Sequence, residues 1–195
     1  MNHAEVLELC AGSGALALTA AVRGARRVVA GDSSLRAILS VRANARMNGL
    51  RVDARRGDLF TVAHAHERFD LVLANPPYLP VAEEESRDER WDAGSDGRLV
   101  LDRIIDGVGG LLKPGARLVL VQSALAGVQA TLERLYENGL EVVRLVEHEG
   151  RLGPIAMARR ENLAHIGALD QGSTRETLIV LTARHMSSAP GPDES

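Results

Sequence analysis

Short apolar runs alternate with longer amphipathic segments along most of the chain. Residues 4–10 and 27–31 are predicted strands, and each is followed by a segment whose apolar residues have helical spacing. Residues 69–74 form an almost purely apolar run, which is typical of a central parallel strand buried on both faces. The same patterns predict further strands at 52–59, 117–122, 141–146 and 177–182, and helices over 35–47, 101–108, 125–135 and 156–165.

Repeated strand–helix units indicate a parallel sheet with helices on both faces. The last two predicted strands lack a full-length helix between them, so we expect an antiparallel strand at that edge. No internal repeat and no second domain is evident. The sequence therefore predicts an α/β, Rossmann-like, doubly wound sheet in one domain over residues 1–185. Residues 186–195 are rich in Ser, Pro, Gly and acids, and we expect a disordered tail there.

Composition narrows the function classes. The net charge of -3 argues against a protein that coats nucleic acid. Cys10 is the only cysteine, which excludes an intrachain disulfide and a cysteine metal cluster, and the six histidines show no metal-ligand spacing. No metal site is therefore predicted. We find no signal peptide and no apolar run near the roughly 20 residues of a membrane span, and we expect a cytoplasmic enzyme domain.

A glycine turn between the first strand and the first helix is the first candidate site. Glu8 and Cys10-Ala11-Gly12-Ser13-Gly14 occupy the position where this architecture binds nucleotide-type cofactors. Asp32 lies 18 residues after Gly14, at the end of the second strand, where a carboxylate can accept the hydroxyls of a ribose. We interpret Cys10 as a small buried side chain at a tight turn rather than as a nucleophile.

Two cofactor classes fit the glycine turn. Residues 12–17 match the G-x-G-x-x-A pattern of dinucleotide sites, so a nicotinamide oxidoreductase is one alternative. Glu8 and Asp58 favour a cationic ligand, because carboxylates repel a pyrophosphate and suit an ammonium, a sulfonium and an adenine amine. Both can equally be surface acids at strand ends. The pattern favours S-adenosylmethionine as the cofactor.

Asn75-Pro76-Pro77-Tyr78 directly follows the buried strand at 69–74 and is the second candidate site. The side-chain carbonyl of Asn75 and the main-chain carbonyl of Pro76 can each accept one N–H of a planar nitrogen. Such a grip would hold this poor nucleophile in line for methyl transfer. The prolines stiffen the loop, and Tyr78 can pack on the flat acceptor. Alone, the tetrapeptide is also compatible with a simple turn.

These motifs resemble the class I methyltransferases with an Asn-Pro-Pro-Tyr motif, and more narrowly the HemK/PrmC-type protein glutamine N5-methyltransferases that modify peptide-chain release factors. The likeness runs from Val6 to Thr182 and includes residues 57–60 and 91–98. It implies a seven-stranded sheet with an antiparallel last strand, cofactor contacts from Gly12, Gly14, Asp32 and Asp58, and a glutamine amide on Asn75 and Pro76. We add to the cofactor site Glu8, Cys10, Ala11, Ser33, Leu59 and Asn75, and to the catalytic site Pro77 and Tyr78.

The resemblance departs from the family at one point. Family members carry a segment before the first strand that covers cofactor and substrate, whereas the first strand here begins almost at Met1. We therefore expect either a truncated sequence or a more open site.

The acceptor class rests on charge. Acids crowd residues 83–96 beside the tetrapeptide, and such a rim repels phosphates and favours a protein acceptor, although a solvated loop has the same composition. Nine arginines lie between Arg23 and Arg56, which we interpret as a solvated surface. The leading hypothesis is a protein glutamine methyltransferase that acts on a release factor. The alternatives are a methyltransferase of exocyclic amines in rRNA or DNA, a nicotinamide oxidoreductase and a cofactor-binding scaffold. Oligomeric state is not predicted.

Overall fold

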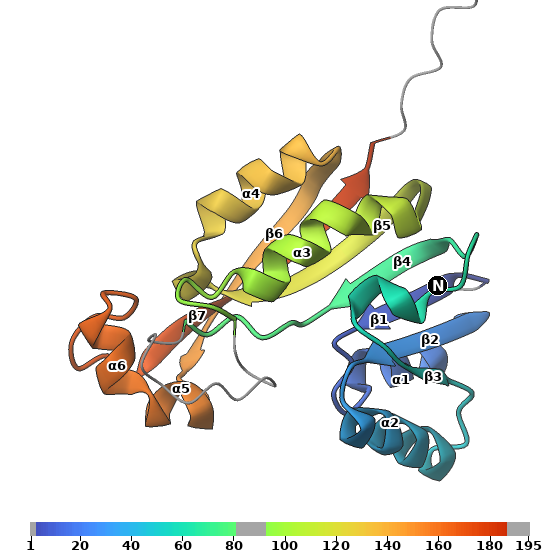
Figure 1. Cartoon of the computed structure of the whole chain (residues 1–195), viewed down its shortest axis with the longest axis horizontal. Coiled ribbons are helices and arrows are strands. Elements are labelled where there is room, and N and C mark those ends of the chain that lie inside the picture. The colour runs from blue at the N-terminus through green and yellow to red at the C-terminus, as the bar shows by residue number, and fades with distance from the viewer. Residues whose placement is uncertain (1–2, 81–92, 187–195) are drawn as a thin grey trace, which may run out of the picture.

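The computed structural model describes residues 3–80 and 93–186, in which seven strands form one sheet in the order β3-β2-β1-β4-β5-β7-β6 (Figure 1). Strands β1 to β5 pair in parallel, while β7 pairs antiparallel with both β5 and β6. The predicted α/β sheet with an antiparallel last strand is confirmed. The strands are β1 (Glu5–Leu9), β2 (Arg27–Asp32), β3 (Asp53–Arg56), β4 (Phe69–Ala74), β5 (Leu112–Ser123), β6 (Leu140–Arg151) and β7 (Arg175–His185).

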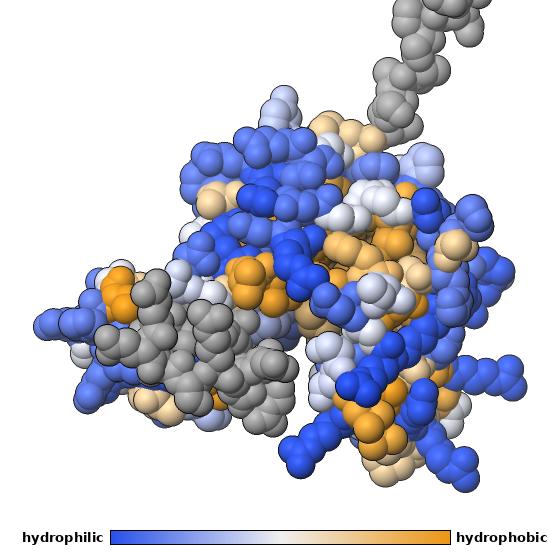
Figure 2. Space-filling model, in the orientation of Figure 1, coloured by the Kyte–Doolittle hydropathy of each residue, from blue (hydrophilic) through white to orange (hydrophobic). Residues whose placement is uncertain are grey.

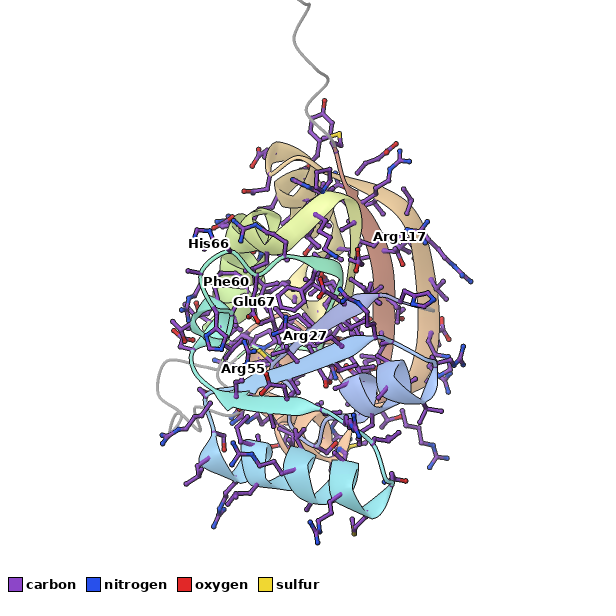
Figure 3. All side chains as sticks on the ribbon, turned by 90° about the vertical axis from the view of Figure 1, so that its right-hand side faces the viewer. Arg27, Arg55, Phe60, His66, Glu67 and Arg117 are labelled. Carbon is purple, nitrogen blue, oxygen red and sulfur yellow. The ribbon has the colours of Figure 1, made fainter. Side chains whose placement is uncertain are left out.

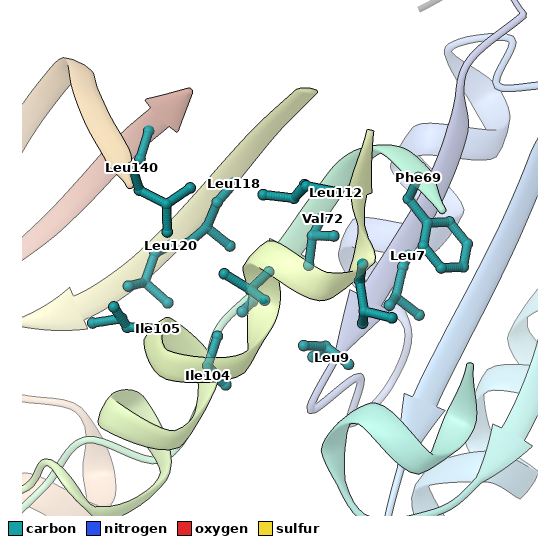
Figure 4. Packing of buried hydrophobic residues seen from close by; sticks show 14 of the residues in the cluster. Leu7, Leu9, Phe69, Val72, Ile104, Ile105, Leu112, Leu118, Leu120 and Leu140 are labelled. Carbon is teal, nitrogen blue, oxygen red and sulfur yellow. The ribbon is translucent and has the colours of Figure 1, made fainter. Parts of the chain in front are cut away.

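Helices cover the sheet from both sides. The aliphatic residues of α1 (Ala15–Val22) and α2 (Leu35–Met47) pack on β1 and β2. On the opposite face, α3 (Leu99–Val108) buries residues such as Ile104 and Ile105 in the core beside β4 and β5 (Figure 4). Full burial of each such side chain stabilises the folded state by roughly 1.5–3 kcal/mol. The helix α4 (Val128–Glu137) lies against β6 and α3. The shorter helices are η1 (Leu59–Val62), η2 (Gly109–Leu111), η3 (Ala124–Ala126), α5 (Pro154–Ala158) and α6 (Arg160–His165).

The third strand is shorter than predicted. It ends at Arg56, whereas the pattern predicted a strand over 52–59. At Gly57 the chain turns back into η1, and a Cβ there would lie 2.6 Å from the Thr61 hydroxyl. Asp58 consequently occupies the N-cap position of η1 instead of the end of a strand, and Leu59 is buried as the first residue of η1.

Other boundaries also differ from the prediction. The strand predicted over 117–122 begins earlier, at Leu112. Its pairing with β4 shifts register after Phe69, and the Lys113 amine meets the Asp70 carboxylate there. Strands β6 and β7 extend well beyond 141–146 and 177–182, since antiparallel pairing continues through their exposed, polar ends. The short helix expected over 156–165 is two helices, α5 and α6.

An ionic cluster joins β2, β3 and the loop before β4 (Figure 3). Glu67 pairs with Arg27 and Arg55, and its carboxylate also accepts the backbone N–H of His64. These hydrogen bonds, above all those from Arg55, lower the pKa of Glu67 far below its usual range. The cluster stabilises the part of the sheet near the start of β2. This part is remote from the carboxyl ends of the strands, where the candidate site lies. Within the described ranges, every helix is too short or too polar to cross a bilayer.

Candidate cofactor and acceptor site

The glycine turn after β1 and the Asn-Pro-Pro-Tyr segment after β4 lie next to each other. They leave the sheet at the point where the order of its strands reverses. β1 lies between β2 and β4, and Leu9 pairs with Ala74, so Cys10 and Asn75 leave the sheet side by side. In open α/β sheets the loops that follow such strands diverge and leave a crevice for ligands. Figure 2 shows a notch in the surface beside the half of the molecule that carries α2.

The glycines of the turn after β1 serve two different purposes. Gly12 has a φ of +53° and is exposed, and a Cβ at this position would meet nothing within 4 Å. The backbone of Gly12 is therefore open to a ligand. Gly14, with a φ of +81°, starts α1, and its Cα packs so closely on α2 that a Cβ would lie 3.0 Å from Val41. Ala11 is buried and donates its N–H to the Gly31 carbonyl, which ties the turn to β2.

Asp32 organises the entrance to this turn. One carboxylate oxygen accepts the N–H of Gly12 at 2.9 Å, and the other accepts the N–H of Ser34 at 2.8 Å. Ser34 in turn caps α2 through its hydroxyl, and Ser33 is exposed. Each carboxylate oxygen keeps a second lone pair, so Asp32 can still accept hydroxyl donors from a ligand.

Glu8 lies beneath the turn. Its side chain is almost fully buried, and its carboxylate oxygens accept the N–H groups of Leu16 at 3.3 Å and Ala17 at 2.8 Å. Burial raises the pKa of Glu8 to about 7, against the opposing effect of these two hydrogen bonds. In this position Glu8 fixes the first turn of α1 and through it the backbone of the glycine turn.

Cys10 is partly buried, so the buried position expected for it is met only in part. It packs against the main core cluster, with a φ of +54°. Burial, followed by the negative charges of Asp32, Asp58 and Glu8, raises the pKa of Cys10 to about 12. The thiol is therefore protonated at neutral pH and unsuited to nucleophilic or redox chemistry.

The Asn-Pro-Pro-Tyr segment presents one free side chain at the same edge. Asn75 is exposed, and neither its amide nor the carbonyl of Pro76 has a hydrogen-bond partner among the described residues. Pro76 is buried and Pro77 half-buried, so the main chain is anchored from below. Tyr78 packs between the main core and the cluster around α5 and α6, where burial and the charge of Glu176 raise the pKa of its phenol.

A second segment returns to this motif. Gly97 packs against the backbone of Tyr78 so closely that a Cβ would lie 2.5 Å from the Tyr78 carbonyl oxygen. Arg98 follows it and donates to Thr131, Asp102 and two carbonyls at the start of α4. These residues were missed as site residues, although residues 91–98 were part of the quoted resemblance. Trp91 and the acids of the predicted rim up to Asp92 lie outside the described residues.

Asp58, predicted to contact adenine, is exposed and forms an ion pair with Arg103 of α3. No pattern in the sequence pointed to Arg103. His64 and His66 are exposed, and the described residues hold no group of His, Cys, Asp and Glu side chains that suits a metal ion.

The sheet order, the glycine turn and the motif after β4 together define a domain of the class I, S-adenosylmethionine-dependent methyltransferase type. The family model described as "Methyltransferase small domain" matches residues 1–148, and the chain belongs to this family. A Methanocaldococcus jannaschii protein, whose name proposes a protein N5-glutamine methyltransferase, is 34% identical over 146 residues, which cover 73% of each chain.

Further relatives are named release factor glutamine methyltransferase. That of Streptomyces coelicolor is 36% identical over 135 residues, which cover 64% of this chain and 47% of the relative. That of Bordetella pertussis is 35% identical over 122 residues, which cover 58% and 45%. The chain thus spans about half the length of these enzymes.

Solved structures establish the fold. The ribosomal protein L11 methylase of Lactobacillus delbrueckii superposes with a TM-score of 0.60 at 18% identity, over 94% of this chain and 71% of the other. The 16S rRNA N2 G1207 methyltransferase of T. thermophilus, in complex with AdoMet and guanosine, superposes with a TM-score of 0.59 at 19% identity, over 96% and 38%. Both likenesses concern the fold and leave the acceptor open.

Proposed function

We propose that this domain transfers a methyl group from S-adenosylmethionine to the side-chain amide of a glutamine in a protein, with a peptide-chain release factor as the substrate. The observation that carries the proposal is the free Asn75 amide beside the open glycine turn. The names of the relatives support the acceptor, since several are release factor glutamine methyltransferases.

The residues present fit the proposed cofactor. Open space above Gly12 leaves room for a ligand against the backbone of the turn. Asp32 has spare lone pairs for a ribose diol, and one oxygen of Asp58 has no partner among the described residues and can accept an adenine amine. When bound, S-adenosylmethionine supplies an electrophilic methyl group on a cationic sulfur. An acidic site favours this cationic ligand over NAD, and a thermal-shift comparison of the two ligands tests that alternative.

The chain's own residues would hold and activate the acceptor. Two N–H bonds of a primary amide match the two free acceptors, the side-chain oxygen of Asn75 and the carbonyl of Pro76. Holding both hydrogens in the amide plane leaves the nitrogen lone-pair density perpendicular to that plane, where a methyl donor can approach it. Fixed acceptors also stabilise the positive charge that develops on the nitrogen. Pro76 and Pro77 lack N–H groups, so no backbone donor competes for these carbonyls.

Five of the nine arginines between Arg23 and Arg56 are held by neighbouring groups, which supports a protein acceptor over a nucleic acid. Arg27 and Arg55 are paired with Glu67, Arg26 with Glu5, and Arg42 bonds the Ala54 carbonyl. Guanidinium groups held in this way contribute little to phosphate binding. A nucleobase amine remains the second candidate, because the rRNA methyltransferase with AdoMet and guanosine shares the fold.

Radiolabelled methyl transfer separates the two candidates. The enzyme is incubated with S-adenosylmethionine labelled in its methyl group and either a purified release factor or total RNA, at low and high salt. We expect label in the protease-sensitive fraction of the release factor reaction. Label that is sensitive to ribonuclease, with a steep salt dependence, would contradict the glutamine proposal.

A further inference from the structure

The ion pair between Asp58 and Arg103 joins two elements that are remote in sequence. The Nη2 atom of Arg103 lies 2.6 Å from one carboxylate oxygen of Asp58. Asp58 precedes η1 on one side of the proposed adenine site, and Arg103 stands in the middle of α3. The other oxygen of Asp58 has no partner among the described residues.

A second contact joins the same two elements. The ring of Phe60 packs so closely on Gly107 that a Cβ there would lie 2.2 Å from it. Gly107 stands one helical turn after Arg103, so α3 holds the turn at 58–62 at two neighbouring points. Leu59 lies between them with a φ of +41° and is buried. The turn that presents Asp58 is thus shaped against α3.

Arg103 lies near enough to the turn after β1 for its positive charge to act on Cys10. Asp32, Asp58 and Glu8 act on the Cys10 thiol as negative charges, and Arg103 acts on it as a positive one. Asp58 makes no side-chain capping bond to η1, so the conformation of its side chain is left to Arg103. The hydrogen bond from Arg103 to one oxygen of the Asp58 carboxylate fixes the direction of the other oxygen, which stays available to a ligand.

We propose that Arg103 is a positioning residue for cofactor recognition: it orients Asp58 so that the free carboxylate oxygen accepts the 6-amino group of adenine. The assignment rests on the proposed function, because it presupposes an adenosyl cofactor at this edge. It makes Arg103 a determinant of base specificity without direct contact to the reacting atoms.

A matched ion pair provides the control. Arg184 and Glu141 join β7 to β6 at 2.5 Å, with side chains 52% and 50% exposed, against 50% and 60% for Arg103 and Asp58. Exposed pairs of this kind contribute little to stability. Arg103→Gln and Arg184→Gln therefore remove equivalent surface pairs, and only the first lies beside the crevice.

Calorimetric titration with S-adenosylhomocysteine and S-inosylhomocysteine tests the assignment, since the second ligand has an oxygen in place of the 6-amino group. We expect wild type and Arg184→Gln to prefer the adenosyl ligand by about tenfold or more. Arg103→Gln should lose most of this preference through weaker binding of the adenosyl ligand alone, and Arg103→Lys, which keeps the charge, should restore part of it. Circular dichroism checks that each variant is folded.

The outcomes separate this inference from the proposed function. Equal weakening of both ligands by Arg103→Gln would show a merely structural role and overturn the assignment, as would an unchanged preference. Failure of the wild-type protein to bind either ligand would overturn the proposed function and, with it, the inference.

Discussion

Glu8 should make the stability of the domain fall as the pH rises toward neutrality. Its folded pKa is raised to about 7 from an ordinary value of 4.5, chiefly by burial. Between these two values the folded state keeps a proton that the unfolded state has released. Rising pH therefore favours unfolding in this window, and above about pH 7 the contribution levels off.

The magnitude follows from the width of the window. Each pH unit lowers the free energy of unfolding by at most about 1.4 kcal/mol, so the full window from 4.5 to about 7 amounts to roughly 3 kcal/mol. Glu8→Gln keeps the shape of the side chain but cannot ionise. The variant loses this pH dependence while it retains that of every other group.

Urea unfolding of wild type and Glu8→Gln at several pH values from 4.5 to 8 measures the effect. As the pH rises through this window, the free energy of unfolding of the variant should increase relative to that of the wild type by a few kcal/mol. Glu133→Gln, which removes an exposed carboxylate from α4, should retain the wild-type fall because Glu8 is still present. If the free energies of unfolding of wild type and Glu8→Gln changed in parallel with pH, the account of Glu8 as a buried carboxyl with a raised pKa would be refuted.

Three further substitutions test the site and its support. Asn75→Ala should lower kcat by about 100-fold or more with the Kd for S-adenosylmethionine unchanged, as measured by single-turnover kinetics and calorimetry, and a variant that mainly weakens the cofactor would count against the acceptor role. Gly97→Ala places a Cβ 2.5 Å from the Tyr78 carbonyl at a φ of +76° and should cost about 1–3 kcal/mol in urea unfolding; an unaltered midpoint would argue against this close packing. Glu67→Gln should lower the free energy of unfolding at neutral pH. This loss relative to wild type should shrink as the pH falls below about 4.5, because the lowered pKa of Glu67 contributes stability that acid removes. A loss that is independent of pH would contradict the ionic cluster.

Periodicity was sufficient to predict the order of the elements and the antiparallel last strand. The apolar run at 69–74 is typical of a strand buried on both faces, and the strand β4 found there is largely buried. The glycine turn marks the end of β1. Boundaries were less predictable where the strand is exposed. The exposed strand β6 continues to Arg151 because its backbone pairs with β7, and backbone pairing leaves no hydrophobic pattern in the sequence.

The geometry of the candidate site was predictable where the backbone conformation dictates the residue type. Gly12, Gly14 and Asp32 lie together as expected, since a tight turn needs glycine and the turn's N–H groups need an acceptor. The direction of the Glu8 side chain was not predictable. A carboxylate at the end of a strand can face the crevice or turn under the next helix, and only the packing of α1 decides between them.

Contacts between remote elements were missed altogether. Arg103 reaches Asp58 across 45 positions of sequence, and nothing in the local pattern of α3 distinguishes it from other exposed arginines. Gly97 has a left-handed backbone conformation, which glycine favours. Its proximity to Tyr78, however, depends on the path by which the chain returns to the edge of the sheet. Such contacts depend on tertiary packing rather than on residue spacing.

Tandem mass spectrometry of a release factor after reaction with methyl-deuterated S-adenosylmethionine tests the central claim most directly. The account predicts one added CD3 group on the side-chain nitrogen of a single glutamine with the wild-type enzyme, and its loss with Asn75→Ala. A CD3 group on another residue type, or transfer that persists when Asn75 is replaced, would contradict it.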